Sequence, residues 1–263
     1  MINVSRSVAL AVWIAAFVLC TGSASAGAER QDDLARFEVE LETGAVWQSK
    51  NDVEIPNDGT ATRFSLKDLA GDGPWPAGRF YFTWNITQRH GLRVLAAPLS
   101  YTETGAFETP VLFAGEAYAA DVPTKATYQF NSWRLTYRYH IKRGTRWNWW
   151  IGFTAKIRDA KIGLRQGSVA SEDTDVGIVP LVYVRGDFRF TERWHFLLDL
   201  DALGGGPGRA EDLSLKLGRD FGDRWQLAFG YRVVEGGADV DEVYNFAWFN
   251  YAVVSGSYRW GRR

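Results

Sequence analysis

The feature that most constrains this chain is an alternation of apolar and polar residues with a period of two. In the first such segment Phe37, Val39 and Leu41 alternate with Glu38 and Glu40. Successive side chains of a β-strand point to opposite faces, so the pattern predicts strands with one apolar and one polar face. We count ten such segments, at 37–47, 80–86, 92–97, 133–139, 147–154, 182–190, 194–201, 213–217, 225–232 and 254–260.

The links between these segments are of two kinds, which alternate. Short turns fall at 88–91, 142–146, 191–193 and 222–224, and long polar links fall near 50–77, 102–125, 159–175, 203–211 and 235–243. Strands joined by tight turns are antiparallel neighbours. The order predicts an up-and-down antiparallel sheet of about ten strands, with both chain ends on the short-turn side. The strand count is open by two, so eight or twelve strands are the alternatives. Extra pairing within the first two long links, for example, would add a hairpin.

Three of the short turns share a repeat, an arginine followed by a tryptophan at 146–147, 193–194 and 224–225. Indole rings are stable where lipid headgroups meet hydrocarbon. We therefore expect an interfacial girdle at this end, formed by Trp147, Trp194, Trp225 and, on the last strand, Trp260. The alternative is a soluble β-barrel or sandwich, which would turn its apolar face inward.

Residues 1–26 have the order of a secretory signal peptide. Arg6 precedes an apolar run from Val8 to Leu19, and small residues lead to an expected cleavage site after Ala26. The run is shorter than the roughly 20 residues of a spanning helix, and no second long apolar run follows. We expect 27–263 to form one barrel domain. The single cysteine, Cys20, lies in the segment to be removed, which excludes disulfides in the mature chain.

Composition supports a barrel wall and excludes one class of partner. Trp, Tyr and Phe number 12, 11 and 16, and glycine reaches 27, as suits strands with one face in lipid and one in a polar interior. Without Arg6, 29 basic residues stand against 31 acidic ones, and the basic residues form no run. We therefore expect no nucleic-acid partner.

The signal peptide, alternating strands, aromatic-flanked short turns and aromatic last strand resemble the small, porin-like outer-membrane β-barrel proteins of Gram-negative bacteria, over essentially the whole mature chain. One departure is that Trp260 is followed by Gly261, Arg262 and Arg263, whereas such proteins usually end on an aromatic residue. The resemblance implies an all-β, up-and-down transmembrane barrel in the outer membrane, with short turns in the periplasm. Its implied partners are outer-membrane lipid, lipopolysaccharide and, during biogenesis, the barrel-assembly machinery.

If the apolar face meets lipid, the other face fills the lumen. The predicted lumen-lining charges are Glu38, Glu40, Glu42, Arg93, Arg134, Arg138, Lys156, Arg158, Arg185, Asp187, Asp199, Asp201, Lys216, Arg232 and Arg259. Barrels of about eight strands are filled by side chains, whereas open channels appear at about 16 to 18 strands. Ten strands therefore predict a narrow or plugged bore.

Position along the strands predicts two ion pairs. Glu38 begins the first strand and Arg259 ends the last, so closure of the barrel places them side by side. Asp199 and Lys216 lie about equally far from the short turns on adjacent strands. Buried charges of this kind are tolerated when they are paired and hydrogen-bonded.

A barrel that cut peptides or lipid chains at its outer rim would need a histidine base there. His90, His140 and His195 all fall near short turns, so we predict no catalytic site and no enzyme. Carboxylates gather at 172–175 and 239–242, but their spacing fits no EF-hand, and the glycines of 204–208 lack the residues of a phosphate cradle. We predict neither metal nor cofactor.

Two functions remain open from the sequence. The first is a structural outer-membrane barrel or a narrow channel that passes solutes through a charged lumen. The alternative is a surface barrel that binds, adheres or modifies lipid through its extracellular loops. The stretch 105–120, with Phe107, Val111, Phe113 and Tyr118, is predicted to form a hairpin projecting beyond the membrane.

Overall fold

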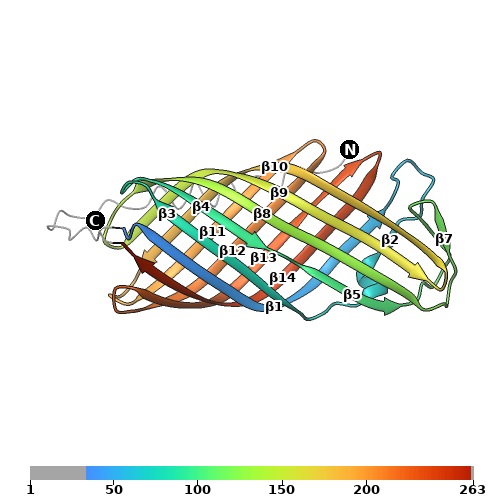
Figure 1. Cartoon of the computed structure of the whole chain (residues 1–263), viewed down its shortest axis with the longest axis horizontal. Helices are drawn as coiled ribbons and strands as arrows, with labels where there is room; N and C mark the ends of the chain where they lie inside the picture. Colours follow the sequence, from blue (N-terminus) through green and yellow to red (C-terminus); the bar gives the residue numbers. More distant parts are fainter. Residues whose placement is uncertain (1–33, 262–263) are drawn as a thin grey trace.

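The computed structural model describes residues 34–261, which form a closed antiparallel β-barrel of ten strands (Figure 1). In order around the wall, the strands are β1 (Phe37–Glu54), β3 (Trp75–Asn85), β4 (His90–Ala97), β8 (Thr124–Lys142), β9 (Trp147–Gln166), β10 (Val169–Arg189), β11 (Trp194–Gly205), β12 (Gly208–Phe221), β13 (Trp225–Val240) and β14 (Val243–Trp260). β5 (Ser100–Gly105) continues β4 along the edge of β8. The pairing of β14 with β1 closes the wall.

The predicted short turns gather at one end of the barrel, together with the C-terminal strand end (Figure 1, left). Phe37 lies opposite Trp260, so the described ends of the chain share that side, as the alternation of links predicts. By the rule that periplasmic turns are tight, this end faces the periplasm. The signal peptide predicted at 1–26 lies outside the described residues.

Three of the predicted long links prove to be mostly strand. The links at 159–175, 203–211 and 235–243 are hairpins that end in turns of two residues, because Gln166 pairs with Val169, Gly205 with Gly208 and Val240 with Val243. Beyond the lipid both faces of a hairpin meet water, so polar residues there do not mark a loop. Gly167, at φ +60°, allows the tight turn of the longest of these hairpins.

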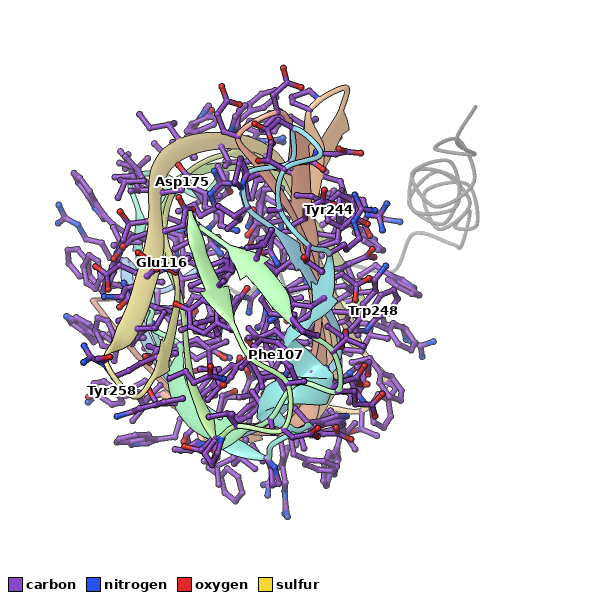
Figure 2. All side chains as sticks on the ribbon, turned by 90° about the vertical axis from the view of Figure 1, so that its right-hand side faces the viewer. Phe107, Glu116, Asp175, Tyr244, Trp248 and Tyr258 are labelled. Atoms are coloured by element: carbon purple, nitrogen blue, oxygen red, sulfur yellow. The ribbon has the colours of Figure 1, made fainter. Side chains whose placement is uncertain are left out.

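The other two long links fold into the barrel mouth. The first contains β2 (Phe64–Ser65) and helix α2 (Leu66–Ala70), which begins where the Ser65 hydroxyl accepts a hydrogen bond from the Asp68 amide at 3.1 Å. The second contains the hairpin of β6 (Val111–Phe113) and β7 (Glu116–Tyr118). Figure 2 looks into this end and shows the hairpin lying across the mouth. Within 34–261, no helix is long and apolar enough to cross a membrane.

The apolar face of the wall points outward. Phe153 is 71% exposed, and Leu41, Phe196, Leu215 and Val254 are also exposed, whereas the inward Glu42 is 1% exposed. This arrangement is the reverse of a soluble barrel, so that alternative is wrong.

Aromatic rings follow the short-turn end of this outer face, where the four predicted girdle tryptophans lie. The ring centroid of Trp147 is 4.2 Å from that of Phe188, and Trp225 lies 4.7 Å from Tyr258. Trp260 stacks on Phe37 at 5.6 Å, and Arg219 lies over the ring of Trp194. The four tryptophans therefore lie at one end of the outer face, and their contact with lipid headgroups stays a prediction.

Candidate functional site: a charged lumen beneath an apolar cap

The interior has two parts, which we call the charged layer and the cap. The charged layer fills the half of the lumen nearest the short turns with acids and bases that reach across the bore. The cap fills the outer half with the buried apolar cluster that includes Val46, Leu66, Phe107, Phe113 and Phe249.

Lys216 on β12 links two strands of the wall that are not neighbours. Its ammonium group donates hydrogen bonds to Glu40 and to Oε2 of Glu42, the latter at 2.8 Å, although both acids lie on β1. The alternation of β1 directs Glu40 and Glu42 inward, and the same alternation directs Lys216 inward. All three side chains are buried, so the contact satisfies charges that water does not reach.

Asp212 is an acid of the layer that three arginines share. It receives Arg79 from β3 and Arg134 from β8, each at 2.7 Å, and also Arg232 from β13. Arg232 in turn donates from Nε to Glu42 at 2.9 Å. Three guanidinium groups from separate strands therefore meet one carboxylate and cross-link the lumen.

A second set of contacts lies beside this centre. Arg93 donates to Asp199 at 2.6 Å, and Arg185 lies 3.4 Å from the same acid. Asp201 accepts from Arg134 at 2.8 Å and from the hydroxyl of Thr154 at 2.5 Å.

At the short-turn end, His195 lies between two carboxylates. Its Nδ1 is 2.8 Å from Asp187 and its Nε2 is 2.7 Å from Asp220. His140 stacks on Trp150 with ring centroids 4.2 Å apart, and His90 lies 2.7 Å from the hydroxyl of Tyr137. All three histidines lie at the end of the barrel opposite the cap.

Two buried cations have no carboxylate within ion-pair distance among the described residues. Arg138 donates to the amide oxygen of Asn85 at 2.7 Å and lies over the ring of Trp150. Lys156 lies over the ring of Phe130, with Nζ 4.6 Å from the centroid, and Arg134 is its partner in register on β8. Aromatic faces, as cation–π partners, take the place that acids hold elsewhere in the layer.

The cap is built on aromatic contacts. Trp75 stacks on Tyr101 with centroids 3.8 Å apart, and Phe64 meets Phe107 and Phe113 edge-on at 5.3 Å and 5.8 Å. The hairpin predicted to project beyond the membrane therefore forms but folds inward, because its apolar residues are buried against the wall. The buried hydroxyl of Tyr118 bonds the carbonyl of Leu164 at 3.1 Å.

A small cavity lies where the two parts meet. This cavity, of about 10 Å³, is lined by Arg79, Arg134, Phe130 and Tyr251, among others. That volume admits about one water molecule.

The predicted lumen charges lie inside the wall, with different degrees of burial. Buried are Glu40, Glu42, Arg93, Arg134, Arg138, Lys156, Asp199, Asp201, Lys216 and Arg232. Half-buried are Glu38, Arg158, Arg185, Asp187 and Arg259. Arg158 differs from the others, since it pairs with Asp175 in the β9–β10 hairpin beyond the charged layer.

Of the two predicted ion pairs, one is confirmed and one is wrong. Glu38 lies opposite Arg259 in register, with Oε2 3.8 Å from Nε. Asp199 instead faces Ser214, and Lys216 faces Leu197. β12 continues two residues past the level at which β11 begins, because barrel strands are staggered, so equal counts from the turns do not give equal heights.

Sequence reasoning missed Arg79 and Asp212. Each lies one residue before the segment that we delimited, at 80–86 and 213–217, and each has the inward parity of its strand. Extending the alternation by one residue would have found both.

The acidic stretches also take specific places. Glu172 pairs with Lys161, and Asp239 accepts a hydrogen bond from Asn57 at 2.9 Å. Within residues 34–261 no group of three or more potential metal-ligating side chains is assembled.

Comparison with solved structures gives the same architecture. The chain aligns with the outer-membrane protease OmpT of Escherichia coli at a TM-score of 0.56 and 8% identity, covering 90% of this chain and 100% of that one. Weaker likenesses include the translocator domain of the autotransporter NalP from Neisseria meningitidis, at a TM-score of 0.40, 10% identity and coverage of 97% and 96%. Another is the neisserial surface protein NspA, at a TM-score of 0.39 and 10% identity, covering 86% of this chain and 98% of that one. No family model and no curated relative matches the sequence. At these identities the likeness concerns the fold.

Proposed function

We propose that this outer-membrane β-barrel is a sealed structural scaffold that passes no solutes and acts through its outer end. The observation that carries the proposal is that two barriers of opposite chemistry lie in series in one bore. A solute that crossed the cap would still meet the cross-linked charges beneath it.

The charged layer is a barrier because its members hold one another. Separating Asp212 from Arg79, Arg134 or Arg232 would leave a buried charge without its partner, which costs several kcal/mol. A conducting pore needs polar groups that exchange their partners with water, and these groups are buried.

The outer end has the features of a fixed surface. The amide of Thr62 donates to the carbonyl of Leu112 at 2.9 Å, and the amide of Ala114 donates to Ile55 at 2.8 Å. These bonds attach the β6–β7 hairpin to the first long link. Loops held in one arrangement lose less entropy on binding than free loops do, which favours recognition over transport.

We also propose that the barrel is not an enzyme. The neighbour OmpT is a protease, but shared architecture at 8% identity does not transfer chemistry. A general base must lie within hydrogen-bond reach of its substrate. His90, His140 and His195 lie at the periplasmic end, and the cap separates them from the outer rim.

Single-channel recording in planar lipid bilayers tests the seal. The purified wild-type barrel is expected to show no conductance steps at either polarity. A variant in which a short Gly-Ser linker replaces residues 106–119 removes one barrier, and adding Asp212→Asn weakens the other. We expect steps only in the combined variant, and reproducible steps from the wild type would contradict the proposal.

A further inference from the structure

The outer face of β8, β9 and β10 carries a basic groove beyond the apolar belt. Its floor includes Gly163, and its walls are Lys125, Thr127, Lys161, Arg165 and Glu172. The groove encloses about 360 Å³ and lies on the outside of the wall, on the extension of the sheet past the lipid.

Two cations in this groove oppose each other directly. Lys125 on β8 is the register partner of Arg165 on β9, and both side chains are exposed. Like charges in directly opposed positions destabilise a sheet. Within residues 34–261, neither side chain makes an ion pair, whereas Lys161 close by pairs with Glu172. An anion between the two cations would remove this repulsion.

The floor of the groove suits a compact anion. Gly163 is paired with Thr127 on one side and Glu172 on the other. A Cβ atom added at Gly163 would lie 3.5 Å from the Cβ of Glu172 and 3.9 Å from the Cε of Lys161, so a larger side chain there would fill the groove between them. The hydroxyl of Thr127 lies 3.1 Å from that of Thr102 on β5, so hydroxyl groups border the cations. Hydroxyls and basic side chains together are the usual ligands of a phosphate group.

The height of the groove identifies the source of the phosphate. Ile157 and its neighbour Trp133 are the last apolar residues on the outer faces of β9 and β8, and Asp159 and Asn131 follow them. Arg165 lies eight residues beyond Ile157, roughly 26 Å of strand, or about 20 Å of height at a tilt near 40°. Phospholipid headgroups extend only about 6 Å beyond the hydrocarbon.

We propose that Lys125 and Arg165 bind a phosphate on the sugar headgroup of lipopolysaccharide in the outer leaflet. This inference requires only the membrane orientation of the barrel and does not depend on the lumen being sealed. Lys161, already paired with Glu172, borders the same groove and contributes a weaker attraction.

Titration of fluorescently labelled rough lipopolysaccharide into the purified, detergent-solubilised barrel tests the site. The variant carrying Lys125→Gln and Arg165→Gln is expected to bind about 25-fold more weakly, roughly five-fold for each basic residue near an anionic surface. The matched control carries Lys142→Gln at the periplasmic end of β8 and Arg146→Gln in the turn just before β9, which together remove the same charge. We expect its affinity to stay within two-fold of the wild type.

Two further arms separate charge from shape and lipid from free ion. Gly163→Val fills the floor without changing charge and is expected to weaken binding several-fold. Lipopolysaccharide dephosphorylated with hydrofluoric acid should bind wild type as weakly as phosphorylated lipopolysaccharide binds the double variant. Equal affinities for the double variant and the wild type would overturn the site. Displacement of the lipid by 10 mM inorganic phosphate would overturn the assignment to a lipid.

Discussion

The two halves of the lumen solve the same packing problem with opposite chemistries. Near the periplasm the inward side chains are charged and cross-linked, as at Asp212, whereas toward the outside they are apolar and meet the rings of Phe107 and Phe113. The wall strands supply the charged layer by themselves. The cap needs α2 and the β6–β7 hairpin, because the wall alone leaves its apolar residues facing an empty mouth. A narrow barrel can thus be filled by electrostatic bridges or by inserted chain.

The largest expected effect is in the charged layer. Asp212→Ala leaves Arg79, Arg134 and Arg232 facing one another without their shared acid, and we expect it to lower the free energy of unfolding by about 4 kcal/mol. Urea unfolding of the barrel from lipid vesicles measures the change.

Asp175→Ala serves as the matched control, since its partner Arg158 is only half-buried in the outer hairpin. It should change stability by less than about 0.5 kcal/mol. Similar losses for the two variants would show that burial does not set the strength of these pairs.

A smaller and more local effect is expected in the cap. Phe113 is fully buried, and Phe113→Ala should destabilise the cap by about 3 kcal/mol through lost contacts and a new cavity. Hydrogen exchange should accelerate in β6, β7 and α2 and stay unchanged in β11 and β12 near the short turns. The control Leu112→Ala alters an exposed neighbour and should leave exchange as it is. Faster exchange throughout the wall would mean that the two halves unfold as one unit.

The smallest effect belongs to the rim pair of Glu38 and Arg259, which is partly exposed at 3.8 Å. Reversing either charge alone, as Glu38→Arg or Arg259→Glu, should cost less than about 1 kcal/mol. The double swap should restore part of the midpoint of thermal unfolding lost in the single variants. The restoration is partial because Arg259 also lies 3.4 Å from Asp220, which the swap leaves facing a glutamate. If the swap gives no rescue, the pair does not stabilise the closing strands.

The wall could be predicted from sequence because each strand carries its own signal. Alternation fixes which side chains share a face, so Glu40, Glu42 and Lys216 could be placed in the lumen without coordinates. The partners of the buried charges could not be found in this way, since Lys216 meets acids on β1, three strands away, rather than Asp199 on the neighbouring strand. Contacts across a lumen depend on stagger and side-chain reach, which a linear pattern does not contain.

The cap was the least predictable part. The sequence predicted a hairpin at 105–120, and the structure contains one. The direction in which the hairpin folds depends on apolar residues that line the inside of the barrel mouth. Those residues, such as Val234 and Phe249, lie on strands more than 100 positions away in the chain. The local sequence therefore predicted that a hairpin forms, but it did not predict that the hairpin folds into the barrel mouth.

The cap also bears on the order in which the barrel assembles. Its apolar cluster includes Val46 and Val53 from β1 and Phe249 and Val253 from β14, the two strands whose pairing closes the wall. The inserted elements come from the first half of the chain, whereas one side of the seam is synthesised last. Their burial is therefore complete only at the moment of ring closure. We therefore expect closure of the seam and burial of the inserted elements to be coupled, so a chain whose insert is not yet packed should hold β1 and β14 incompletely paired.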